Sequence, residues 1–154
     1  MVKKIAVATG TRAEFGLLQP LIDKIVADPE TELQLIVTGM HLSPEFGMTV
    51  DEIRDAGYEV ADEIEILLSS DSGVGVAKSV GLATINFADT LRRLSPHWLV
   101  VLGDRFEMLA AATAAMLIGV PIAHIHGGER TEGAIDESIR HSITKMAQLH
   151  FVST

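Results

Sequence analysis

The chain has 154 residues, of which 47% are hydrophobic and 21% are charged, a composition typical of one globular domain with a sizeable core and not of a disordered chain. Asp and Glu outnumber Lys and Arg by 21 to 12, which gives a formal net charge of −9, and so acidic a surface argues against nucleic acid or an anionic membrane as a partner. The absence of cysteine excludes disulfides, thiolate metal ligands and a cysteine nucleophile.

The amino-terminal stretch MVKKIAVATGTRAEF is charged too early, and its apolar part is too short, for a signal peptide. No apolar run approaches the roughly 18 residues that span a bilayer. We therefore expect a cytoplasmic protein. A small anionic ligand is compatible with the acidic composition, because a few well-placed arginines can reverse the field inside one cleft.

Short apolar runs alternate with stretches of helical spacing along the whole chain. In chain order, the pattern predicts a strand at 3–10, a helix at 13–28, a strand at 32–39, a loop at 40–47, a helix around 48–57, a strand at 62–68, a helix at 76–94, a strand at 97–104, a helix at 105–119, a strand at 120–128, a helix at 134–148 and a strand at 149–154. Gly16 and Pro20 weaken the first helix locally, and the serines of SSDSG offer N-caps for the long third helix.

Strands that are apolar on both faces and alternate with helices predict a doubly wound α/β domain with a parallel sheet. We find no internal repeat, linker or low-complexity segment. The chain stops at a strand without a closing helix, so we expect residues 1–154 to be one domain of a longer protein.

Polar segments follow the predicted strands: TGTRAE, TGMHLS, LLSSDSG, LGDRFE and HIHGGE. Ligands bind outside the carboxyl ends of the strands in an open parallel sheet, so these segments should meet at one ligand-binding edge. Gly10 and the helix start after it suit a phosphate, with Arg12 as a forked cation, although Arg12 could equally be an ordinary surface residue. Asp104, which precedes Arg105, could cap the next helix or serve a ligand.

HIHGGE has several interpretations. His124 and His126 alternate on a strand and should point to the same face, where Glu129 could complete a metal site. The glycines break regular geometry beyond His126, and no further histidine cluster is visible, so an acid–base role is favoured over a metal. His124 fits a hydrogen-bonded core residue, and His126 is better placed to meet a ligand.

The predicted last helix begins close to the same edge. Asp136 and Arg140 are four residues apart, which suits a surface ion pair. Glu129, Asp136 and Glu137 could instead supply an acid or base, if burial and mutual repulsion raise their pKa values. Gly73 and Gly75 do not have the spacing or strand context of a dinucleotide loop, so no nicotinamide cofactor is predicted.

The motifs GTRAE, TGMHLSPEFG, LGDRFE, IAHIHGGE and GAIDESIRHSITK occur here in order, and with them the chain closely resembles the N-terminal domain of hydrolysing UDP-N-acetylglucosamine 2-epimerases. The resemblance implies a Rossmann-like domain of a GT-B-type architecture, in which the substrate lies between two domains. The second domain, which supplies most contacts to UDP, would lie outside residues 1–154, so the isolated chain should be inactive.

The implied reaction converts UDP-N-acetylglucosamine and water to N-acetylmannosamine and UDP for sialic or nonulosonic acid synthesis. UDP would leave to give a glycal, and water would then add, without a metal or other cofactor. Two alternatives stay open: a UDP-2,4-diacetamido-trideoxy sugar as substrate, and a non-catalytic domain that binds a nucleotide sugar or self-associates. A homo-oligomer is expected.

The resemblance also implies roles for individual residues. The implied acid–base residues are Asp104, His126, Glu129 and Asp136, and the implied substrate contacts are Arg12, His41, Arg105, Arg140 and His141. Many relatives carry glutamate in place of His126, and several carry lysine in place of Leu17. A histidine can still shuttle a proton near pH 7, Glu129 could replace the lost carboxylate, or the exchange could mark a different UDP-sugar.

Overall fold

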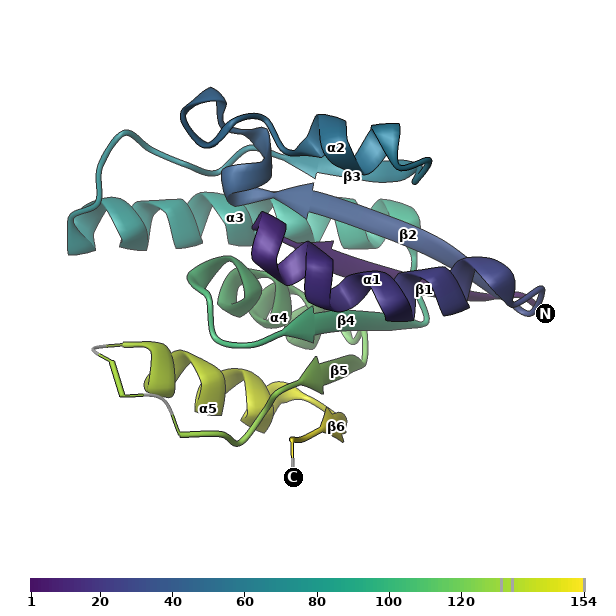
Figure 1. The fold of residues 1–154 in the computed structure, drawn as a ribbon. Helices are drawn as coiled ribbons and strands as arrows, with labels where there is room; N and C mark the ends of the chain where they lie inside the picture. Colours follow the sequence, from purple (N-terminus) through teal and green to yellow (C-terminus); the bar gives the residue numbers. More distant parts are fainter. Residues whose placement is uncertain (131, 134, 154) are drawn as a thin grey trace.

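The computed structural model describes residues 1–130, 132–133 and 135–153 and has a six-stranded parallel sheet between two layers of helices (Figure 1). The strands are β1 (Lys3–Thr9), β2 (Thr31–Thr38), β3 (Val60–Ile64), β4 (Trp98–Leu102), β5 (Ile122–Ile125) and β6 (Leu149–Phe151). Their order is β3-β2-β1-β4-β5-β6, and every neighbouring pair is parallel. The predicted doubly wound α/β fold is confirmed.

The helices are α1 (Arg12–Ala27), α2 (Val50–Asp55), α3 (Gly73–Leu94), α4 (Phe106–Ile118) and α5 (Asp136–Met146). Helices α1 and α2 pack on one face of the sheet, and α3, α4 and α5 pack on the other. Strand β1 shows why: Ala6 and Ala8 point to the α3–α5 face, whereas Val7, between them, points to the α1–α2 face. A strand buried on both faces needs an unbroken apolar run, which β1 and β4 have.

Helix α1 runs without a break through Gly16 and Pro20, the two residues expected to weaken it. Proline removes the hydrogen bond to the carbonyl four residues earlier, which here belongs to Gly16. Both residues are exposed, so solvent can satisfy that carbonyl. The helix is also held at its start by a capping box between Thr11 and Glu14.

The segment 40–47, expected as a loop, forms two 3₁₀ turns, η1 (Gly39–Leu42) and η2 (Pro44–Phe46). The third strand ends at Ile64, earlier than expected, and the residues that follow run out toward α3. Helix α3 begins after Ser72, whose hydroxyl accepts the Gly75 N–H, as the serine-rich segment predicted.

The carboxyl ends of all six strands lie at one edge of the sheet, at the left of Figure 1. The connections leave β1 and β4 in opposite directions, which makes the gap between these neighbours the topological switch point where such sheets bind ligands. The described helices include none that is long and apolar enough to cross a membrane.

Candidate active site

A buried arginine ties together the loops that follow β4 and β5. Arg140 of α5 is 9% exposed, and its Nη2 donates to Asp104 Oδ2 at 2.5 Å. Its Nη1 donates to Glu129 Oε2 at 3.1 Å and to the backbone oxygen of His126 at 2.7 Å. We call Asp104, His126, Glu129 and Arg140 the Arg140 cluster. The helix cap of α4 is Arg105, so Asp104 faces this cluster and does not cap the helix.

His126 lies beyond the end of β5 and has a left-handed backbone, with φ of 58°. The expectation that His124 and His126 alternate on one strand is therefore wrong, because β5 ends at Ile125. The His126 Nδ1 lies 2.9 Å from Glu129 Oε1, and Ser153 also donates to Glu129 Oε1. Hydrogen bonds from Ser153 and His126 lower the pKa of Glu129. The carboxylate takes Nδ1, so Nε2 is the nitrogen that can exchange a proton with a ligand.

His124 is fully buried and satisfied, as expected for a core histidine. Its Nε2 lies 2.8 Å from the Gly103 carbonyl oxygen, which can only accept, so Nε2 carries the proton. Its Nδ1 therefore accepts from the Thr144 hydroxyl at 3.1 Å, and that hydroxyl accepts the Gly128 N–H at 3.1 Å. A side chain at Gly127 would come within 2.7 Å of His124 Nδ1. This Thr144 network fixes the residues next to Asp104 and Glu129.

Arg105 follows Asp104 in the chain, and its guanidinium is held by the buried carboxylate of Glu107. Its Nε and Nη2 donate to the two oxygens of Glu107, at 3.2 and 3.1 Å, and Glu107 is fully buried. Burial acts against the charge of Arg105, but the negative charges of Glu107, Glu14 and Asp136 prevail and raise its pKa. Arg105 therefore stays cationic, and Asp136, at the start of α5, lies within its field.

Glu14 and Glu107 were not among the predicted site residues. Glu14 Oε2 accepts the N–H groups of Gly10 and Thr11 at 2.8 and 3.1 Å, while its Oε1 is buried with no hydrogen-bond partner in the described part of the chain. Burial raises the pKa of Glu14 to about 7, and the charge of Glu107 adds to the shift. The Thr-x-x-Glu capping pattern in TRAE was the available signal for Glu14; Glu107 stands inside an apolar helix, with no comparable pattern.

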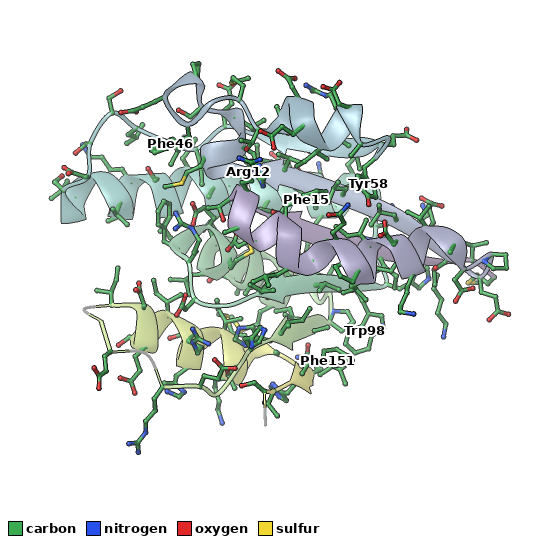
Figure 2. All side chains as sticks on the ribbon, viewed as in Figure 1. Arg12, Phe15, Phe46, Tyr58, Trp98 and Phe151 are labelled. Carbon is green, nitrogen blue, oxygen red and sulfur yellow. The ribbon has the colours of Figure 1, made fainter. Side chains whose placement is uncertain are left out.

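Arg12 and His41 lie near β1 and β2, and their contacts lead away from the Arg140 cluster. Arg12 pairs with Glu52 of α2 at 3.0 Å, and both side chains are mostly exposed. Figure 2 shows Arg12 at the start of α1, well separated from α5. His41 is fully buried, with Nε2 3.0 Å from Thr9 Oγ1 and Nδ1 2.7 Å from Thr49 Oγ1. Burial lowers the pKa of His41 to about 4, so its ring is neutral.

His141 lies on α5 with its Nε2 3.6 Å from Glu137, and both side chains are about half exposed. Leu17, where several relatives carry lysine, is 64% exposed on α1. Hydrogen bonds therefore join Asp104, His126, Glu129 and Arg140 directly, and the charge of Asp136 acts on Arg105, the residue after Asp104. The side-chain contacts described above for Arg12, His41 and His141 are with other residues.

A family model described as UDP-N-acetylglucosamine 2-epimerase matches residues 23–154. A Campylobacter jejuni protein named GDP/UDP-N,N'-diacetylbacillosamine 2-epimerase (hydrolyzing) is 48% identical over 98% of this chain and 39% of its own length. The UDP-N,N'-diacetylbacillosamine 2-epimerase (hydrolyzing) of Legionella pneumophila is 38% identical over 100% of this chain and 41% of its own length. The chain thus spans about two fifths of the curated relatives it matches.

Solved structures agree on the fold. The UDP-GlcNAc 2-epimerase of Neisseria meningitidis bound to UDP-GlcNAc superposes with a TM-score of 0.83 at 21% identity, covering 97% of this chain and 39% of that one. The Methanocaldococcus jannaschii enzyme in complex with UDP-GlcNAc and UDP gives a TM-score of 0.83 at 23% identity, with coverage of 98% and 40%. Since the family model spans most of the sequence and a relative shares almost half of its residues, this chain belongs to the UDP-N-acetylglucosamine 2-epimerase family.

Proposed function

We propose that the full-length protein is a hydrolysing 2-epimerase that acts on a UDP-linked N-acetylated sugar, and that residues 1–154 form its N-terminal, sugar-side domain. A second, UDP-binding domain would lie outside this chain. The Arg140 cluster carries the proposal: in a member of an epimerase family, it gathers two carboxylates and a histidine at the ligand-binding edge of the sheet.

The names of the relatives favour one substrate. A protein 48% identical to this chain is named for GDP/UDP-N,N'-diacetylbacillosamine, and one 38% identical is named for UDP-N,N'-diacetylbacillosamine, whose sugar is a 2,4-diacetamido-trideoxy sugar. We propose this sugar nucleotide as the substrate, which places the alternative of the sequence analysis ahead of UDP-N-acetylglucosamine. The latter is the second candidate, because a Neisseria meningitidis relative named UDP-N-acetylglucosamine 2-epimerase is 39% identical.

The chemistry asks for two kinds of group. The proton on C2 is not acidic, so the C1–O bond to the diphosphate must break early and leave positive charge on the ring, which carboxylates stabilise. A base then takes the C2 proton to give the glycal. Water finally adds: its hydroxyl goes to C1, and a proton goes to the face of C2 opposite to the one from which the first proton was taken. The products are UDP and the free sugar with inverted C2.

We assign these steps to residues of the site. His126 takes the C2 proton through Nε2, and Glu129 orients its ring from Nδ1. Asp104 and Asp136 supply the carboxylates, and Asp136 delivers the new proton to the opposite face of C2. Arg105, which follows Asp104 in the chain, contacts the sugar. Arg140 prevents the carboxylates that it joins from repelling one another.

The remaining predicted residues take different roles. Arg12 and His141 keep exposed side chains, so we propose them as substrate contacts, Arg12 on the diphosphate side. His41 is buried against two threonines, so we propose that it positions η1 and does not touch the sugar.

The test uses the full-length protein with each UDP-sugar in D₂O, with product followed by NMR and UDP by a coupled assay. We expect UDP release, deuterium at C2 of the product, and loss of both in Asp104→Asn and Asp136→Asn. Asp55→Asn, an exposed position at the end of α2, is the matched control. Near-normal turnover in both site variants, or no turnover of either sugar by the wild type, would refute the proposal.

A further inference from the structure

A cleft of about 650 Å³ opens between η2, the segment after β3 and the first turns of α3 and α4. We call it the η2–α3 cleft. The segments that line it lie at the carboxyl edge of the sheet (Figure 1), and Arg105, which follows Asp104 of the Arg140 cluster, is part of its lining. Among the individual site residues predicted from the sequence, Arg105 alone lines it, and the predicted polar segments TGMHLS and LLSSDSG supply much of the remaining lining.

Part of the lining of the η2–α3 cleft is apolar. Phe46 and Leu68 line it and are 46% and 42% exposed, although both are large hydrophobic side chains. Leu67 and Phe106 also line the cleft, and each is partly buried. Figure 2 shows Phe46 at the outer side of the molecule, above α3. Apolar side chains left open at a ligand-binding edge suit the methyl groups of a ligand.

The lining of the cleft also offers hydrogen-bonding groups. Ser43, Ser69 and Ser79 line the cleft, and a hydroxyl can both donate and accept. The segment that carries Ser69 is packed tightly on α3, because a side chain at Gly75 would come within 2.6 Å of Ser70 Oγ. That close approach explains the glycine at 75. A wall of methyl-binding and amide-binding groups fits an acetamido substituent better than a bare hydroxyl.

Arg105 connects the cleft to the Arg140 cluster. Its guanidinium is fixed by the two hydrogen bonds to Glu107, and Asp136 lies within its field. In a pyranose ring, C4 lies across from C1, and C6 is carried on the neighbouring C5. A sugar whose C1 and C2 lie at the Arg140 cluster therefore extends its C4 and C6 substituents away from the reacting carbons.

We propose that the η2–α3 cleft binds the C4–C6 end of the sugar and selects an acetamido group at C4 and a methyl group at C6. The serine hydroxyls bind the amide, and Phe46 and Leu68 contact the two methyl groups. The proposal rests on the function proposed above. It adds the residues that distinguish a 2,4-diacetamido-trideoxy sugar from N-acetylglucosamine, which has hydroxyl groups at both positions.

The test measures kcat/KM of the full-length protein for UDP-N,N'-diacetylbacillosamine and UDP-N-acetylglucosamine. In the double variant Phe46→Ala/Leu68→Ala we expect a fall of about tenfold or more for the diacetamido sugar and of less than about threefold for UDP-N-acetylglucosamine, since apolar pocket contacts of this size discriminate by such factors. Leu117→Ala, 73% exposed at the end of α4, is the matched control. If only one sugar turns over, the other is measured as a competitive inhibitor.

A second variant tests the cleft in the opposite sense. Ser69→Phe, at an exposed position, narrows the cleft and should exclude the bulkier C4 substituent while sparing UDP-N-acetylglucosamine. Equal losses for both sugars in these variants, or no loss, would overturn the cleft assignment and leave the proposed function standing. A wild-type protein that releases UDP from neither sugar would instead refute the proposed function, and the cleft assignment with it.

Discussion

The two halves of the ligand-binding edge are built differently. Beyond β4 and β5, carboxylates and a histidine meet a buried arginine, and the His126 and Glu129 side chains remain 42% and 33% exposed. Beyond β1 and β2, a neutral histidine is sealed between two threonines, and the nearest ion pair, Arg12 with Glu52, lies on the surface. Charges that are paired yet accessible suit proton transfer, whereas a sealed histidine suits positioning.

Removal of Arg140 should have the largest effect, because this residue joins the loops that follow β4 and β5 and has no counterpart beyond β1 and β2 in the described part of the chain. Arg140→Ala leaves Asp104 and Glu129 without their shared cation, and loss of one partner of a buried pair costs about 3–5 kcal/mol. We expect the free energy of unfolding, measured by urea denaturation, to fall by an amount near the lower end of this range, and we expect UDP release to be lost. Arg140→Lys keeps the charge but not the fork, so it should recover more stability than activity. Full activity in Arg140→Lys would show that the activity does not need the two-pronged hydrogen bonding of the Arg140 guanidinium.

Glu14, which is buried beside the end of β1, predicts how the stability of the protein depends on pH. Its pKa is raised from 4.5 to about 7 by burial, so the folded protein binds this proton more tightly than the unfolded chain does. The resulting stability is complete below pH 4.5 and is lost as the pH rises through 7.

Glu14→Gln, which stays neutral, should escape that loss. Its stability relative to the wild type should rise between pH 4.5 and 7 and level off above, by up to about 3 kcal/mol from the shift. Denaturation midpoints across pH 4 to 8 measure the difference. Curves for variant and wild type that stay parallel would show that Glu14 does not titrate in this range.

Thr144→Val tests how the loops that carry Asp104 and Glu129 are positioned. The substitution leaves His124 Nδ1 and the Gly128 N–H without their shared partner, which costs about 1–3 kcal/mol. Because the network fixes the residues beside Asp104 and Glu129, we expect kcat to fall more than KM rises. Thr144→Ser keeps the hydroxyl and should restore kcat. A valine variant with normal kcat would limit the network to stability.

The sequence predicted the sheet and its polar edge because both follow from local patterns. Apolar runs identify β1 and β4, and polar residues after a strand identify a site. The contacts that the site residues make with distant parts of the chain were not predictable from the sequence. Arg140 meets Asp104 across 36 positions of sequence, and spacing favoured its neighbour Asp136. The burial of His41 depends on how η1 folds over β1, and the left-handed backbone of His126 lies beyond the strand in which simple alternation had placed it.

The smallest change in stability is expected at the exposed pair. Arg12→Ala and Glu52→Gln each remove the same ion pair, and exposed pairs contribute about 0–1 kcal/mol, so both variants should unfold close to the wild type. Their kinetics should differ, because only Arg12 is proposed to reach the diphosphate from the start of α1. A rise in KM for the UDP-sugar in Arg12→Ala alone supports that contact. An equal rise in both variants would mean that the ion pair, through the position of α2, matters to binding and that the arginine itself does not touch the substrate.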